Sequence, residues 1–450
     1  MLDAMRRKLE RTAIPVIPLK ITAFATTGQG IGVLESDLSC HSTDKQGTDY
    51  KETFSFLGIK VFLWNAIPGE IVTKFLILNQ KSHFIEGIAL EFTSTSPSRV
   101  MPKDHQYLST SPWQILSPVA ELEAKRDILS SLFHHLNLHH QIEPEKITQI
   151  SILQSKNNYF YRNKMEYSLY FDHQSAKIQL AVHHRGSHRK LPITTSSIEI
   201  PNIFQTANQI IETLNREHQD ARKYQTLLLR ASQDGTVQGG LLENGKPHPI
   251  FPNLTDSLLG HTYSYSPNGF FQINLPIYEQ ALIQIKQFLS EAKTVLDLYA
   301  GVGTIGLSVA REKNLTLVEV NGSAFRELQA NTLRAVQETK NSRLQSILAK
   351  SEEILDLISS RTSVILDPPR AGCDEKLIQK LCEIKPEKIV YLSCNPITQG
   401  RDLDPLLGFY HIESIQGFNF FPHTPHIESL VLLTRRTRIP LSSQKHLDLT

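Results

Sequence analysis

"LDLYAGVGTIG", residues 296–306, is the stretch that decides the fold of this chain. An apolar run leads into three glycines, Gly301, Gly303 and Gly306, and a second apolar stretch follows them. In a Gly-x-Gly-x-x-Gly loop the first glycine permits a tight turn and the second lets a ligand approach the backbone, while the third allows close packing of helix on strand. The stretch therefore predicts a strand, a ligand-binding loop and a helix.

The residues around this loop alternate between strand and helix patterns from about residue 265 onward. The expected strands are 293–300, 315–320, 363–370, 388–396, 411–418 and 428–435, with a helix expected over 323–336. This alternation is typical of a doubly wound parallel sheet, whose ligands bind at the carboxyl ends of the strands.

The N-terminal half has a different pattern. Residues 15–95 predict short strands separated by Gly and Pro turns, which is typical of a small β-barrel. Helical apolar spacing covers 120–138, paired strands are expected over 158–185, and a helix followed by a strand over 203–230. We therefore expect a mixed α/β protein with an N-terminal barrel.

The composition is that of an ordinary globular protein, with 40% hydrophobic and 20% charged residues among 450. A formal net charge of +2 gives no strong overall field, so any polyanion site must come from local clusters. Four scattered cysteines without a Cys-x-x-Cys pair argue against a disulfide framework and against a metal site such as zinc. No run of about 18 apolar residues is found, and residues 1–18 lack a signal-peptide core, so we expect no membrane span and a cytoplasmic location.

Glu319 ends the strand that follows the glycine loop. A carboxylate there can accept hydrogen bonds from both ribose hydroxyls of a nucleoside. This fits NAD as well as S-adenosylmethionine, so both cofactors stay open on these residues alone, as does a glycine-rich turn without a ligand.

Two further strand ends carry reactive groups. Asp367 precedes Pro368 and Pro369, which stiffen its loop because proline fixes φ and removes a backbone donor. Cys394 ends the next strand, in "YLSCNP". A free cysteine is commonly inert packing. However, the carboxyl ends of parallel strands share one edge, so the glycine loop, Asp367 and Cys394 are expected around one crevice, which favours Cys394 as a nucleophile.

The other cysteines have no such placement. Cys40 lies in a polar loop, and Cys373 and Cys382 lie in a helix-like stretch, so we interpret all three as structural. Glu428 precedes the last apolar strand. A glutamate there is more often a solvated charge, and it contributes to the chemistry only if it faces Cys394.

Arg162 and Lys164 are the best candidates for contacts with phosphate groups. They are interleaved with the aromatic residues of 159–161, which offer stacking surfaces for bases. The basic runs 183–190 and 435–438 are further candidates, although charge runs are more often solvated faces.

Taken together and in order, these motifs resemble the RNA uracil-C5 methyltransferases. More narrowly, the chain is similar to the 23S rRNA (uracil-5-)-methyltransferases that carry an N-terminal TRAM barrel. The matching stretches are "GQGIG", "NAIPGE", "PSRVMP", "YRNKMEYS", "FFQINLPIYEQAL", "LDLYAGVGTIGL", "DPPRAG", "YLSCNP" and "FPHTPHIESLVLL".

The resemblance implies that Cys394 is the nucleophile, that Glu428 is the general base, and that S-adenosylmethionine is the cofactor. In relatives the position of Thr304 is commonly an asparagine. The residues that would contact the cofactor or lie beside it are Gln272, Tyr299, Gly301, Gly303, Thr304, Glu319 and Asp367.

One departure from the pattern concerns iron. Relatives with a TRAM barrel often hold a [4Fe–4S] cluster through four cysteines, three of them just after the "PSRV" segment. That segment contains no cysteine here, and a cubane cluster generally needs cysteine ligands. We expect no iron–sulfur cluster in this chain.

The resemblance also implies three domains: a TRAM-like RNA-binding barrel at 14–95, a central α+β RNA-binding domain at 96–264, and a Rossmann-like class I methyltransferase domain at 265–440. The expected activity is methylation of C5 of a uridine in 23S rRNA by a monomeric enzyme. A tRNA uracil-54 C5 methyltransferase is the alternative with the same chemistry. A dinucleotide-dependent oxidoreductase and a catalytically idle RNA-binding protein are the alternatives from other classes.

Overall fold

The computed structural model describes residues 13–35, 38–43, 49–54, 57–140, 142–217, 224–243, 246–247 and 251–436. These residues form two compact units. Unit 1 takes residues up to 128 together with 182–191 and 423–425, and unit 2 takes the rest.

Unit 1 is built on an N-terminal β-sheet, which confirms the β-rich N-terminal region. Its strands lie in the order β1-β7-β8-β6-β3-β2, around a core that includes Val61, Leu63, Phe75 and Ile85. β4 and β5 pair separately as a hairpin. The bounds are β1 (Ala13–Lys20), β2 (Ala23–Phe24), β3 (Gly30–Val33), β4 (Leu38–Thr43), β5 (Asp49–Phe54), β6 (Lys60–Trp64), β7 (Ile71–Gln80) and β8 (Phe84–Ser94).

The segment after the sheet forms α2 (Tyr107–Thr110), the 3-10 turn η1 (Pro112–Ile115) and the first half of α3 (Pro118–Asn137). Trp113 is fully buried there, and its indole N–H donates to the Gly28 carbonyl at 2.8 Å. Lys125 and Glu121 of α3 form a buried ion pair of 2.8 Å close to the same ring. Trp113 is therefore a core residue of unit 1.

Unit 2 begins with the second half of α3, followed by α4 (Pro144–Thr148) and a mainly antiparallel sheet in which β11, β10, β13, β14 and β15 are neighbours. The amphipathic helix α5 (Pro201–Arg216) packs on β13. The hairpin β16–β17 follows. The bounds are β10 (Lys164–Asp172), β11 (Lys177–His183), β12 (Lys190–Pro192), β13 (Thr226–Ala231), β14 (Val237–Glu243), β15 (Lys246–Pro247), β16 (Leu254–Leu258) and β17 (His261–Tyr265).

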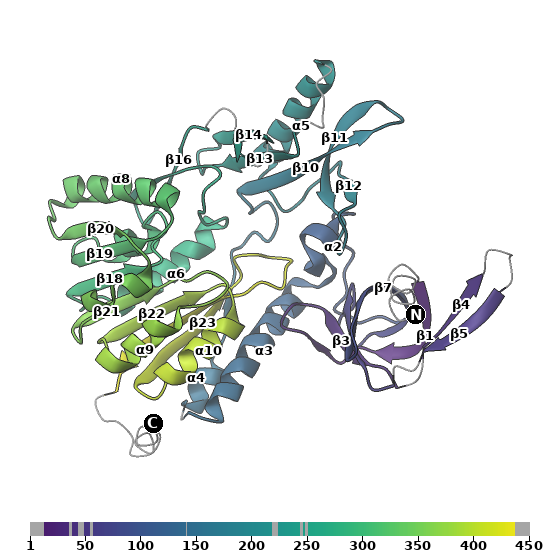
Figure 1. The fold of residues 1–450 in the computed structure, drawn as a ribbon, viewed down its shortest axis with the longest axis horizontal. Helices are drawn as coiled ribbons and strands as arrows, with labels where there is room; N and C mark the ends of the chain where they lie inside the picture. The colour runs from purple at the N-terminus through teal and green to yellow at the C-terminus, as the bar shows by residue number, and fades with distance from the viewer. Residues whose placement is uncertain are drawn as a thin grey trace. The chain divides into compact units, whose positions relative to one another are not determined.

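The C-terminal sheet of unit 2 has the order β20-β19-β18-β21-β22-β24-β23-β9. Figure 1 labels the strands from β18 to β23 in this sheet. The five strands from β20 to β22 are parallel, and β24 runs antiparallel to β22. The bounds are β18 (Thr294–Leu298), β19 (Asn314–Glu319), β20 (Leu344–Leu348), β21 (Thr362–Leu366), β22 (Lys388–Ser393), β23 (Tyr410–Phe418) and β24 (Glu428–Arg435). The parallel sheet predicted from the alternation of strands and helices is confirmed.

Alternate side chains of this sheet enter two different cores. Val295, Leu317 and Val390 face one side, where they pack with α6 (Leu275–Phe288), α7 (Thr304–Val309) and α8 (Gly322–Thr339). Leu296 and Val318 face the other side, where they pack with α3, α9 (Glu375–Ile384) and α10 (Pro396–Leu406). The period of two along each strand thus produces a three-layer α/β/α arrangement.

The sheet also contains a strand from the middle of the chain. β9 (Ile152–Leu153) pairs in parallel with the end of β23, and Leu129 and Phe133 of α3 belong to the core on the α9–α10 face. The boundaries 14–95, 96–264 and 265–440 stay a prediction, since the observed division into two units runs along different lines. No helix in the described ranges is long and apolar enough to cross a membrane.

Candidate active site

The glycine loop follows β18 and precedes α7, as its pattern predicts. Gly303 has φ +91° and caps α7, and a Cβ atom there would lie 2.7 Å from a methyl group of Leu328. At Gly306 a Cβ atom would lie 2.6 Å from Oδ2 of Asp297, whose carboxylate accepts the Gly306 N–H at 2.8 Å. These positions need glycine because backbone conformation or close packing leaves no room for a side chain.

Glu319 closes the loop from the neighbouring strand β19. Its Oε2 accepts the Gly301 N–H at 2.8 Å and its Oε1 accepts the Asn321 N–H at 2.6 Å. Each carboxylate oxygen has a second lone-pair direction, so both can still accept from a ligand hydroxyl. The predicted acidic residue is therefore held rigidly beside the first glycine.

Three other predicted cofactor residues have different surroundings. Thr304, the first residue of α7, is half-buried, and its hydroxyl lies 2.9 Å from the Tyr278 hydroxyl. Gln272 is buried, and its backbone carbonyl accepts from Asn163 at 3.1 Å. Tyr299, with φ +64°, packs instead with the core on the α9–α10 face.

Asp367, Cys394 and Glu428 come together at the ends of neighbouring strands. β21 and β22 are adjacent and parallel, so Asp367 and Cys394 follow them at the same edge of the sheet. In the antiparallel pair β22–β24, Ser393 lies opposite Ser429, which brings the next residues, Cys394 and Glu428, face to face. Glu428 thus lies opposite Cys394 in the strand register, and its role as a general base stays a prediction.

The three groups lie within electrostatic range of one another. Burial raises the pKa of the Cys394 thiol to about 11, and Glu428 and then Asp367 add to the rise. Glu428 is buried, and its pKa lies well above the usual range because of desolvation and the Asp367 carboxyl. Burial also raises the pKa of Asp367, to about 7. Without a ligand, the Cys394 thiol is thus mainly protonated near neutral pH, and Asp367 is about half ionised.

Arg370 is a site residue that sequence reasoning missed. Its guanidinium lowers the pKa of both Cys394 and Glu428, against the effects of burial. Its backbone carbonyl accepts hydrogen bonds from the Asn395 amide at 2.9 Å and the Thr398 hydroxyl at 3.2 Å. The sequence could have indicated Arg370, because a basic residue three positions after Asp367 shares the same rigid loop.

α10 ties the Asp367 loop to the Cys394 strand. Buried Asp402 accepts from the Cys373 N–H at 2.7 Å and from the Tyr391 hydroxyl at 2.6 Å, and Arg401 donates to it at 2.8 Å. The amide of Gln399 donates to the Tyr391 and Ser429 carbonyls, each at 3.0 Å, and so joins β22 to β24. One helix therefore fastens the three strand ends that carry Asp367, Cys394 and Glu428.

Of the cysteines interpreted as structural, Cys373 is buried and Cys382 is partly buried. Cys373 is buried in the core, which raises the pKa of its thiol to about 12, and burial raises that of Cys382 to about 11. Neither belongs to the Cys394 cluster. The Cys40 side chain lies outside the described residues. In the described ranges no group of three or more His, Cys, Asp or Glu side chains could hold a metal ion.

Arg162 and Lys164 lie apart from these strand ends, beside the segment that carries Gln272. Arg162 Nε donates to the Lys164 carbonyl at 2.8 Å. Lys164 Nζ contacts the Asn268 carbonyl and Glu166, each at 3.3 Å. Burial lowers the pKa of Lys164, and the positive charges of Arg230 and Arg162 lower it further.

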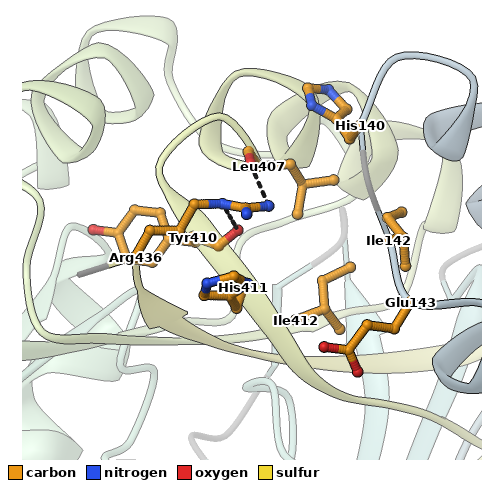
Figure 2. A pocket seen from close by; sticks show the side chains of 8 residues that line it. All are labelled: His140, Ile142, Glu143, Leu407, Tyr410, His411, Ile412 and Arg436. Atoms are coloured by element: carbon orange, nitrogen blue, oxygen red, sulfur yellow. Dashed lines mark hydrogen bonds between the residues drawn. The ribbon is translucent and has the colours of Figure 1, made fainter. Parts of the chain in front are cut away.

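A small pocket lies elsewhere in unit 2, against β23 (Figure 2). Arg436 crosses it, and its guanidinium donates to the carbonyls of Tyr410 at 3.1 Å and Leu407 at 3.4 Å. Arg436 belongs to the basic run 435–438, whereas the predicted catalytic and cofactor residues do not line the pocket. The remaining lining residues are His140, Ile142, Glu143, His411 and Ile412.

Comparisons with known proteins place this site in a family. Residues 259–436 match the tRNA (uracil-5-)-methyltransferase family model. An uncharacterized RNA methyltransferase of Staphylococcus epidermidis is 28% identical over 435 residues, covering 84% of this chain and 92% of that protein. The uncharacterized RNA methyltransferase YwfF of Lactococcus lactis is 25% identical over 500 residues, covering 93% and 91%.

Among solved structures, the Pyrococcus abyssi tRNA (uracil-54, C5)-methyltransferase in complex with S-adenosyl-L-homocysteine is similar in fold. It has a TM-score of 0.67 at 20% identity, and the alignment covers 93% of this chain and all of that one. The comparisons thus support an RNA methyltransferase. They are similarities to the RNA uracil-C5 methyltransferase family, and the family model matches the C-terminal part of the chain that carries the candidate site.

Proposed function

We propose that this protein methylates C5 of a uridine in 23S rRNA through a covalent bond between Cys394 and C6 of the base. S-adenosylmethionine supplies the methyl group, as a sulfonium cation whose methyl is electrophilic. The observation that carries the proposal is the register of β22 and β24, which sets Cys394 opposite Glu428 beside Asp367.

The residues at the strand ends fit this methyl donor. Glu319 is held with lone pairs directed away from its backbone partners, which suits ribose hydroxyls. Burial raises the pKa of Asp297 to about 8, and the nearby Asp367 and Glu319 carboxyls add to the rise. A cluster of crowded carboxyl groups is a favourable environment for a cation.

Uracil C5 is too weakly nucleophilic to accept a methyl group unaided. Addition of the Cys394 sulfur to C6 forms an S–C6 bond and converts the C5–C6 double bond into an enolate whose C5 is nucleophilic. After C5 has gained the methyl group, Glu428 accepts the C5 proton as a general base. The electron pair of the C5–H bond restores the double bond, the S–C6 bond breaks, and the Cys394 thiolate leaves.

Activation of both groups depends on Arg370. The thiolate and the carboxylate are the reactive forms, whereas burial favours the thiol and the carboxylic acid. The Arg370 guanidinium is the charge that opposes burial at both groups. We assign it the role of keeping a reactive fraction of Cys394 and Glu428 ionised.

Reaction at C6 requires access to a face of the base, so the uridine must leave any stack and enter the site. Arg162 and Lys164 are proposed to contact the RNA backbone. Arg230 and Arg162 both lower the pKa of Lys164, so three positive charges lie near one another there. Positive charges favour the binding of phosphate groups. Sequence-specific recognition favours a loop, where bases can be splayed out.

A tRNA with uridine at position 54 is the second candidate substrate. It is favoured by the similarity to the Pyrococcus abyssi tRNA (uracil-54, C5)-methyltransferase along most of the chain. The resemblance to TRAM-containing enzymes favours 23S rRNA. We further propose that the enzyme is a monomer and acts in the cytoplasm. Mass-spectrometric mapping of 5-methyluridine in rRNA and tRNA from a deletion strain decides between the substrates, by showing which RNA loses the modification.

The covalent step is tested with 23S rRNA and tRNA transcripts that contain 5-fluorouridine, since fluorine at C5 cannot leave as a proton. The unaltered protein should form an adduct that survives denaturing electrophoresis, and Cys394→Ala should form none. Glu428→Gln should accumulate an adduct with ordinary uridine RNA. Full turnover by Cys394→Ala would disprove the mechanism.

A further inference from the structure

Two buried tyrosine hydroxyls meet hydroxyl side chains on the same short helix, α7. The Tyr278 and Thr304 oxygens are 2.9 Å apart, and the Tyr263 and Ser308 oxygens are 2.7 Å apart. Thr304 and Ser308 are four residues apart, so they lie one turn from each other on one face of the helix. Both tyrosines are 1% exposed, so the two pairs are matched in chemistry and in burial of the ring.

The two pairs differ in their access to a ligand. Thr304 follows Gly303 directly as the first residue of α7, and it is half-buried. Ser308, one turn further on, is 1% exposed. A molecule bound on the glycine loop can therefore reach the Thr304 hydroxyl, whereas Ser308 is enclosed by protein.

The surroundings of Tyr278 link it to the active site. Its ring packs edge-on against Phe420, with 5.7 Å between the ring centroids. The Asp367 carboxyl is close enough to add to the effect of burial on the pKa of the Tyr278 hydroxyl, which lies well above its usual value. A buried hydroxyl costs free energy unless it is hydrogen-bonded, and Tyr278 makes that bond with Thr304.

We propose that Tyr278 is a positioning residue for the methyl donor, which holds the Thr304 hydroxyl in the orientation that contacts S-adenosylmethionine. Two hydroxyls joined by one hydrogen bond retain one O–H hydrogen that the pair itself does not use. That hydrogen allows the pair to donate to a ligand on the loop. The inference rests on the proposed function, since it requires S-adenosylmethionine at the glycine loop.

The test is calorimetric titration of the full chain with S-adenosylhomocysteine. Tyr278→Phe and Thr304→Val should each weaken binding by about fivefold to tenfold, the loss expected for one hydrogen bond. The double variant should bind no more weakly than Thr304→Val, because Tyr278 acts only through Thr304. In assays of methyl transfer, the KM for S-adenosylmethionine should rise while the KM for RNA stays unchanged.

Tyr263→Phe and Ser308→Ala are the matched controls, because they break the equally buried pair on the same helix. They should leave the affinity for S-adenosylhomocysteine within about twofold, while lowering the unfolding midpoint as much as Tyr278→Phe does. Equal weakening by the controls, additive effects in the double variant, or unchanged affinity in Tyr278→Phe would each overturn the inference. If the unaltered chain bound no S-adenosylhomocysteine, the proposed function would fail together with the inference. If the unaltered chain bound it and Tyr278→Phe bound it equally well, only the inference would fail.

Discussion

Arg370 carries the positive charge that acts on both proposed reactive groups. It follows the rigid Asp367-Pro368-Pro369 segment, and hydrogen bonds from Asn395 and Thr398 hold its backbone carbonyl. Its guanidinium opposes the rise in the pKa of Cys394 and of Glu428 that burial causes. The reactivity of the thiol should therefore depend on this side chain.

Arg370→Met should slow alkylation of Cys394 by iodoacetamide. Loss of the guanidinium raises the thiol pKa further above about 11, so at pH 8 the thiolate fraction falls. We expect a decrease of about threefold to tenfold, the effect of half a unit to one unit of pKa. Peptide mass spectrometry measures the rate at Cys394 separately, and Cys382 in the same sample is the control. An unchanged rate at Cys394 would contradict the role of Arg370.

The affinity for S-adenosylmethionine should increase from pH 6 to pH 8. Asp367, with a pKa of about 7, is mainly neutral at pH 6 and mainly ionised at pH 8. The ionised form attracts the sulfonium cation, whereas S-adenosylhomocysteine lacks that charge and should show a smaller change. We expect a difference of about threefold to tenfold between the two ligands across this range.

Calorimetric titrations with both ligands at several pH values measure this linkage. Asp367→Asn keeps the size of the side chain but removes its titration, so it should abolish the difference in pH dependence between the ligands. Equal pH dependence of the two ligands with the unaltered protein would show that Asp367 does not respond to the sulfonium charge.

At the scale of elements, α10 is the part that holds the site together. It begins directly after the Cys394 turn, and its Asp402 and Gln399 fasten the Asp367 loop, β22 and β24 to one another. Sequence reasoning identified the strand ends, because strand and glycine patterns are local. It did not identify these contacts, because Tyr391 and Cys373, which donate to Asp402, are 11 and 29 residues away and come together only in the folded sheet.

Asp402→Ala should lower the free energy of unfolding by about 2–4 kcal/mol, because it leaves buried donors unpaired. Asp404→Ala is the control on the same helix. Asp404 is half exposed and pairs with His140 at 2.8 Å, so its loss should cost less than about 1 kcal/mol. Urea unfolding measures both. Equal effects of the two substitutions would show that the Asp402 network does not stabilise the site.

At the scale of the whole molecule, the cysteine inventory leads to a prediction about iron. The chain has four cysteines, and one of them, Cys394, is the proposed nucleophile. Cys373 and Cys382 lie with α9 in the C-terminal core. A [4Fe–4S] cluster is generally held by about four cysteine thiolates, more than remain here.

Protein purified under anaerobic conditions should therefore contain no stoichiometric iron and show no absorption from an iron–sulfur cluster. Elemental analysis and the visible spectrum measure this directly. About four irons per chain would contradict the prediction.

The local chemistry of the chain was determined by its sequence alone. The glycine loop, the Pro-Pro rim after Asp367 and the Cys394 turn depend on φ restrictions and on strand–helix alternation, which act between near neighbours. The pairing of Cys394 with Glu428 and the insertion of β9 into the C-terminal sheet were decided only by the tertiary structure. The tertiary structure also decided that the charge of Arg370 acts on both reactive groups and that Tyr278 contacts Thr304. Each of these depends on strand order and register, which arise when the whole core packs.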